Sequence, residues 1–219
     1  MTEAVRELQR RLEDLYEVEV PHDVREFLIT DARLARILEG GKGRDCSEKL
    51  LVRQDDEETL ELSLYLDADL LARFEADSPL RHLHAGNLET FCTVLEGVSH
   101  FVYLAWRAGA DCPVSLLELE LQAEVDKYAV GLSLAAEQHG GQVPGDLWAR
   151  LFRAVRFDPR LDAGAARRYR RASEAAAGFC RALHQALLEG RAGGQRATRA
   201  LRRYYRLRPA AKLAAPALV

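Results

Sequence analysis

"GNLETFCTVLEGVSHFVYLAWRAG", residues 86–109, has the apolar periodicity of one long helix. Its apolar face recurs at spacings of three and four residues and comprises Phe91, Val94, Leu95, Val98, Phe101, Val102 and Ala105. A polar stripe follows the same helix and comprises Glu89, Glu96, His100, Tyr103 and Arg107. Glu96 and His100 are four residues apart, so their side chains can touch on one side of the helix.

The next segment predicts a second helix that returns antiparallel to the first. Ser115 and Glu118 have the spacing of a capping box, and the helix that they begin should run to about His139. The linker before it is short, as in antiparallel helical hairpins. Folding the pair about that linker predicts a polar seam with His100 opposite Glu124, Glu96 near Lys127 and Tyr128, and Tyr103 opposite Glu120.

Two interpretations of this seam remain open at the level of sequence. In the first, Glu96, His100, Glu124 and Lys127 form a buried hydrogen-bond and salt-bridge network that fixes the helix pairing. In the second, Glu96, His100, Glu120 and Glu124 converge on an iron, manganese or zinc ion, with His82 or His84 of the preceding linker as a further ligand. Carboxylate di-iron bundles repeat a Glu-x-x-His pattern, whereas this chain has Glu-x-x-x-His once.

The remaining patterns predict an α+β fold that is predominantly α-helical. Leucines at positions 60, 62, 64 and 66 alternate with polar residues, which predicts a β-hairpin over residues 49–66. The hairpin should pack its leucine face on a bundle of helices, because an isolated hairpin is marginally stable. The stretch YEVEV (16–20) could add a short strand, and Asp31 and Asp67 have the positions of helix N-caps.

Charge divides the chain more clearly than any other feature. The net charge is −3, yet residues 164–219 carry thirteen Lys and Arg against two Glu, and residues 1–163 carry eighteen basic and thirty-two acidic residues. We therefore expect an acidic body over 1–163, a basic helical segment over 164–207 that packs on this body or on a partner, and a loose tail over 208–219.

The basic segment suggests a binding surface. Arginine matches phosphate geometry and tyrosine can stack on bases, so the candidate residues for binding a partner or a polyanion are Arg199, Arg202, Arg203, Tyr204 and Arg206. Clustered charge also arises where basic helices dock on acidic ones, and no helix-turn-helix or zinc-finger pattern accompanies it. A protein partner or self-association is the main expectation, with nucleic acid as the alternative.

Composition points to a cytoplasmic protein. The sequence has no apolar run long enough to span a membrane, and its first residues lack the apolar centre of a signal peptide. The four cysteines form no Cys-x-x-Cys pair, which suits a reducing compartment. Dinucleotide-binding, Walker and Gly-x-Ser-x-Gly motifs are absent.

The sequence thus leaves two functional hypotheses. The first is a non-catalytic, cytoplasmic binding or regulatory protein of bacterial type, which acts through helical surfaces and the basic C-terminal segment. The alternative is a metal-dependent helical-bundle enzyme with its Glu/His site in the helical hairpin of residues 88–139.

Overall fold

A computed structural model describes residues 2–41, 46–54, 60–142, 145–153, 159 and 161–215, and it confirms the predominantly helical α+β class. The helices of these residues are α1 (Thr2–Tyr16), the short 3₁₀ helix η1 (Val24–Glu26), α2 (Ala32–Leu38), α3 (Ala68–Ala76), α4 (Leu88–Ala108), α5 (Leu116–Gln138), α6 (Leu147–Phe152), α7 (Ala163–Leu187), α8 (Arg191–Tyr205) and α9 (Pro209–Leu213). The strands are β1 (Leu28–Ile29), β2 (Glu48–Gln54) and β3 (Leu60–Leu66).

The predicted β-hairpin is confirmed. Strands β2 and β3 pair antiparallel, with Leu50 opposite Leu64 and Glu48 opposite Leu66. Leu64 and Leu66 are fully buried, because this face of the hairpin packs on α4. The predicted turn, residues 55–59, lies outside the described residues.

A third strand pairs with the hairpin, but it is not the predicted YEVEV stretch. Helix α1 continues to Tyr16, and Val18 and Val20 bury their side chains without joining the sheet. The third strand is β1, which pairs parallel with β3 and gives the sheet order β1-β3-β2. The apolar alternation at residues 16–20 therefore reflects burial of these side chains and not pairing in the sheet.

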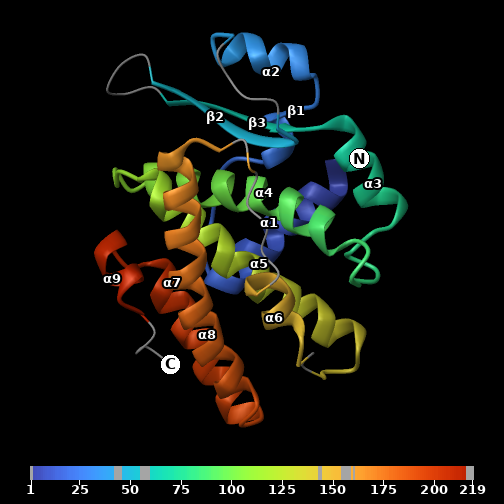
Figure 1. The fold of residues 1–219 in the computed structure, drawn as a ribbon, viewed down its shortest axis with the longest axis vertical. Helices are drawn as coiled ribbons and strands as arrows, with labels where there is room; N and C mark the ends of the chain where they lie inside the picture. Colours follow the sequence, from blue (N-terminus) through green and yellow to red (C-terminus); the bar gives the residue numbers. More distant parts are fainter. Residues whose placement is uncertain are drawn as a thin grey trace.

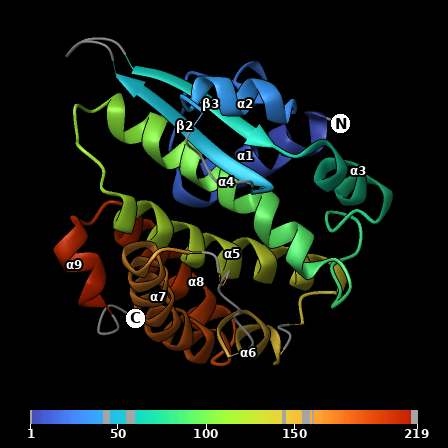
Figure 2. The same cartoon turned by 45° about the horizontal axis from the view of Figure 1, so that its top comes forward.

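The elements stack in layers. Helix α2 and the sheet lie at one end of the molecule (Figure 1), α4 lies under the sheet, and α5 lies between α4 and the helices α7 and α8 (Figure 2). One continuous hydrophobic cluster joins residues of the sheet, α1, α4, α5, α7 and α8. The basic helices therefore pack on the acidic body. None of the helices described here is long and apolar enough to cross a membrane.

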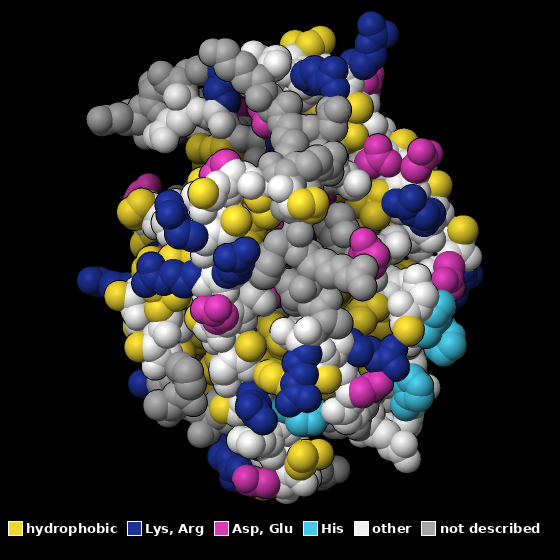
Figure 3. All heavy atoms as spheres, viewed as in Figure 1, with side chains coloured by type: hydrophobic (Ala, Val, Ile, Leu, Met, Phe, Trp, Pro, Cys, Tyr) yellow, Lys and Arg dark blue, Asp and Glu magenta, His cyan; other side chains and the backbone are white. Residues whose placement is uncertain are grey.

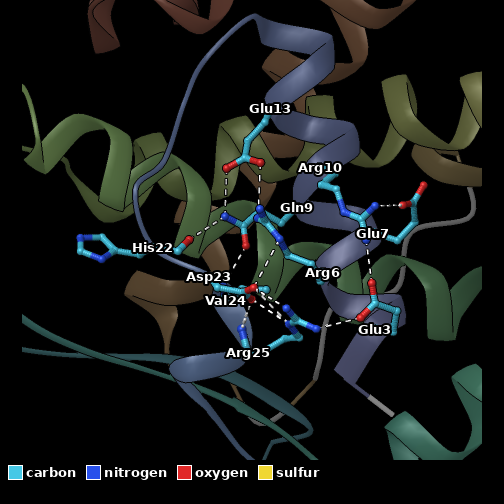
Figure 4. A network of polar contacts seen from close by, with 10 residues as sticks. All are labelled: Glu3, Arg6, Glu7, Gln9, Arg10, Glu13, His22, Asp23, Val24 and Arg25. Atoms are coloured by element: carbon cyan, nitrogen blue, oxygen red, sulfur yellow. Dashed lines mark hydrogen bonds and ion pairs between the residues drawn. The ribbon is translucent and has the colours of Figure 1, made fainter.

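Helix α1 is held to the segment that follows it by polar contacts (Figure 4). The buried side chain of Gln9 donates to the main-chain oxygen of His22 and accepts from the main-chain nitrogen of Val24, both at 2.8 Å. On the exposed side, Arg25 pairs with Asp23 at 2.7 Å and with Glu3 at 2.8 Å. These contacts bring the chain back along α1 and lead it into β1.

Three predicted helix caps are confirmed. Asp31, Asp67 and Ser115 each accept a hydrogen bond from the first turn of the helix that they precede. Asn87, in the N-cap position of α4, makes no such bond, because its Oδ1 accepts from the main-chain nitrogen of His84. Its Nδ2 donates to the main-chain oxygens of Asp77 and His82, which also holds the linker.

Part of the C-terminal segment that was expected to be loose is helical. Residues 209–213 form α9, which begins with Pro209, and both Lys212 and Ala215 are buried. A lysine and a small apolar residue anchor this segment, and neither belongs to a hydrophobic periodicity. The last four residues, 216–219, lie outside the described part of the chain.

Candidate metal site between α4, α5 and the hairpin

Three of the four predicted metal ligands converge. Glu96 and His100 on α4 and Glu120 on α5 each present one ligand atom, and these atoms lie within 4.8 Å of one another. The Nε2 atom of His100 is 3.9 Å from Oε2 of Glu120. The fourth predicted ligand, Glu124, is not among these three residues and pairs with Lys127 at 2.8 Å.

The relative register of α4 and α5 explains which side chains of the two helices meet. The predicted pairing of Glu96 with Lys127 is confirmed at 2.6 Å. The other two pairings are wrong by about a turn or less: His100 faces Glu120, and Tyr103 donates a hydrogen bond to Glu118 at 2.6 Å. Helices α4 and α5 lie obliquely to one another (Figure 2), so a single register cannot hold along the whole interface.

A fourth carboxylate reaches the cluster from the sheet. Oε1 of Glu48, the first residue of β2, lies 3.6 Å from Nδ1 of His100. Gly97 makes room for it, because a Cβ atom there would lie 2.9 Å from Cγ of Glu48 and 2.8 Å from Cδ1 of Leu64. Sequence reasoning missed Glu48, although its two-residue spacing from Leu50 puts it on the buried face of the hairpin.

Fixed cations offset only part of the negative charge. Lys127 pairs with Glu96 and Glu124, and Arg168 on α7 lies 3.5 Å from Glu120. Together with Glu48, four carboxylates face two permanently charged cations, which leaves two negative charges for His100 and any bound cation to balance. With all four carboxylates ionised and His100 neutral, a divalent ion would balance this charge.

The pKa values of the cluster reflect this imbalance. Burial raises the pKa of Glu120 to about 7, although His100 and Arg168 act against it. Burial opposes the charged form of His100, but Glu48, followed by Glu120 and Glu96, outweighs it and raises the pKa of the imidazole to about 9. Burial also disfavours ionised Glu96, yet Lys127 and His100 bring its pKa below the ordinary value.

Three buried polar atoms of the cluster lack hydrogen-bond partners among the described residues. They are Nε2 of His100, Oε1 of Glu48 and Nε of Arg168. His100 is 7% exposed, so water does not readily satisfy its ring nitrogen. An unsatisfied buried polar group is costly, and either a bound ion or a shortening of the ion pairs of His100 with Glu48 and Glu120 removes this cost.

The linker histidines do not join this cluster. His82 and His84 line a separate surface cavity of about 540 Å³, together with His139 and Arg150. Figure 3 shows histidine side chains close together on one face of the molecule. Both ring nitrogens of His84 are engaged, one by Asp77 at 3.1 Å and the other by the main-chain nitrogen of Gly86. In this structure neither histidine is among the converging ligand atoms.

The predicted C-terminal binding residues divide into two groups. Arg199 and Arg203 are exposed. Arg202 donates to the main-chain oxygen of Leu15 and pairs with Glu17, and Arg206 donates to the main-chain oxygen of Glu17. These two arginines tie α8 to the end of α1.

Tyr204 belongs to the core. Its side chain is fully buried and stacks on Phe179 with ring centres 4.2 Å apart. The ring is therefore closed to a nucleic-acid base, and its predicted stacking role is wrong.

Comparison of the chain with protein-family models, with curated proteins and with solved structures gives no match. The functional argument therefore rests on the geometry described above.

Proposed function

We propose that this protein binds one divalent metal ion through Glu96, His100 and Glu120. The observation that carries the proposal is Nε2 of His100, which is buried, lacks a hydrogen bond within the described residues, and is directed at Glu120. Burying a polar ring nitrogen between carboxylates without a hydrogen bond is unfavourable, whereas a cation that displaces the imidazolium proton is coordinated by this arrangement.

The surroundings of His100 resemble those of imidazole ligands in general. A metal-binding histidine commonly places its second ring nitrogen against a carboxylate, which fixes the ring orientation and raises its basicity. Glu48 stands in this position at Nδ1, on the side of the ring opposite Glu120. We therefore assign Glu48 the role of orienting the imidazole.

The donor set indicates the class of metal. One imidazole nitrogen and two or more carboxylate oxygens suit iron(II), manganese(II) or zinc(II) better than copper(I), which prefers sulfur ligands. An ion held there would supply Lewis acidity, which is the basis of the alternative hypothesis of a metal-dependent enzyme. The chain's own contribution is to hold Glu96, His100 and Glu120 on two packed helices.

Elemental analysis of untagged protein, purified without chelator and then loaded with Mn²⁺, Fe²⁺ or Zn²⁺, tests this proposal. We expect close to one metal ion per chain in the wild type and a loss of tenfold or more in affinity for His100→Ala and Glu120→Gln. Glu89→Gln is the matched control, because Glu89 is an exposed residue of the same helix. A wild type that takes up no metal under these conditions would leave the cluster as a structural network.

A partner-binding role for the basic segment is a second proposal, and the exposed side chains of Arg199 and Arg203 support it. Deleting the segment is a poor test, because Ala197, Leu201 and Tyr204 of α8 belong to the core. The double variant Arg199→Glu, Arg203→Glu keeps those contacts. We expect it to lose self-association or capture of a protein partner, and unchanged association would remove these residues from any interface.

A further inference from the structure

A second buried polar cluster lies beneath α9, and Lys212 is at its centre. The side chain of Lys212 is 1% exposed, and it enters a space between α4, α5 and α8. The polar residues around it, which come from α1, α4 and α5, are Tyr16, Ser99, Tyr103, Glu118, Gln122 and Asp126. None of them belongs to the proposed metal site.

Lys212 is the donor in both of its side-chain hydrogen bonds, and each of its two partners is a donor to a carboxylate. Nζ donates to the hydroxyl oxygen of Tyr103 at 2.8 Å and to Oε1 of Gln122 at 2.6 Å. Tyr103 in turn donates to Glu118 at 2.6 Å, and Gln122 donates to Asp126 at 2.7 Å. Each chain of bonds therefore begins at the ammonium group and ends at a buried carboxylate, an arrangement that favours a cationic donor.

Aromatic rings complete the enclosure. Nζ lies 4.1 Å from the ring centre of Tyr103, 5.3 Å from that of Tyr204 and 5.7 Å from that of Tyr205. A cation over several aromatic faces is the arrangement by which proteins recognise alkylammonium groups. The rings and acceptors together offset part of the cost of burying the charged amine.

The enclosure is supported by groups other than Lys212. Asp126 also accepts hydrogen bonds from Tyr16 at 2.5 Å and from Ser99 at 2.6 Å. Tyr205 is stacked on Tyr16 with ring centres 3.9 Å apart. These contacts hold the walls in place independently of α9, a helix of only five residues.

We propose that Tyr103, Gln122, Tyr204 and Tyr205 form an alkylammonium-binding site and that Lys212 is its ligand, supplied by the same chain. The ligand class is a primary alkylamine in its charged form, such as a lysine side chain. A free alkylammonium ion of matching length occupies the site when the lysine side chain is removed.

The test uses the full chain with Lys212→Ala, which keeps Cβ and vacates the volume of an n-propylammonium group. The thermal midpoint is measured at pH 6 during titration with n-propylammonium chloride, with n-propanol as the uncharged analogue and potassium chloride as the salt control. We expect a saturable rise in the midpoint with propylammonium, with half-saturation at least fivefold lower than for propanol. Lys212→Met, which fills the same space with an uncharged chain, should show no such rise.

Equal responses to the amine and the alcohol, or equal responses of the Ala and Met variants, would overturn the proposal. If Lys212→Ala does not fold alone, its refolding yield is measured in the presence of each compound instead. Recovery with propylammonium alone supports the site, and recovery with neither compound or equally with both contradicts it. Metal content plays no part in this readout, so the result is independent of the proposed metal site.

Discussion

Lys212 donates a hydrogen bond of 2.8 Å to the hydroxyl group of Tyr103, which lies 109 residues earlier in the chain. The bond ties the C-terminal helix α9 to α4, the helix that carries His100. Burial lowers the pKa of Lys212 to about 7, with Glu118 and Asp126 acting against the shift and Arg107 adding to it. The C-terminal segment is thus attached through a group that titrates near neutral pH.

This pKa shift predicts how stability depends on pH. Between about pH 7 and 10 the unfolded chain holds the Lys212 proton and the folded chain does not, so the free energy of unfolding should rise with pH through this window. Lys212→Met lacks the effect. The two slopes should differ by up to one proton, about 1.4 kcal/mol per pH unit, in urea unfolding at pH 7, 8 and 9. If the free energies of unfolding of the wild type and Lys212→Met change with pH in parallel, Lys212 does not have the lowered pKa.

Gly97 is predicted to be a packing requirement of the sheet on α4. A Cβ atom at this position would lie 2.8 Å from Leu64 and 2.9 Å from Glu48, closer than carbon atoms approach. Gly97→Ala should therefore lower the free energy of unfolding by about 1–3 kcal/mol. Gly109→Ala is the control, because its Cβ atom would meet its nearest neighbour at 3.6 Å and its φ of −63° suits alanine. Urea unfolding in which both variants match the wild type would show that the sheet readily shifts.

The sequence predicted the layers of the fold better than the contacts between them. Apolar spacing identifies the helix of residues 86–109 and the hairpin, because burial of one face is a local property of each element. The pairing of His100 with Glu120 rather than Glu124 depends on how obliquely two helices cross. That angle is set by side-chain packing over the entire interface.

The contributions of Glu48 and Lys212 were missed for a different reason. Both are charged residues in stretches whose composition suggests exposure, and charged side chains are seldom buried unless partners are ready for them. Their partners lie on elements distant in sequence, at His100 for Glu48 and at Tyr103 and Gln122 for Lys212. A single sequence carries no local signal for such pairs, although the alternation through Leu50 already put Glu48 on the buried face.

Two buried tyrosines should respond in opposite ways to removal of the hydroxyl group. The hydroxyl of Tyr16 donates to Asp126, whereas that of Tyr204 is buried and has no hydrogen-bond partner among the described residues. Tyr16→Phe should destabilise the protein by about 1–3 kcal/mol, because it removes one of the hydrogen bonds that the buried carboxylate of Asp126 accepts. Tyr204→Phe should be neutral or stabilise by up to about 1 kcal/mol. Urea unfolding of both variants under one condition makes the comparison, and equal losses would count against the hydrogen-bond assignment.

Glu48 separates the metal proposal from the structural interpretation of the same cluster. If Glu48 orients His100 for a metal ion, Glu48→Gln should lower the affinity for Zn²⁺ or Mn²⁺ by about 10- to 100-fold, as is usual when a carboxylate that holds a ligand histidine is lost. Glutamine keeps the size of the side chain, so the fold should remain. The matched control is Glu61→Gln, because Glu61 is an exposed residue of β3 in the same sheet. Isothermal titration with each metal measures the effect, and an affinity equal to that of the wild type would remove Glu48 from the site while leaving Glu96, His100 and Glu120 to be tested by their own variants.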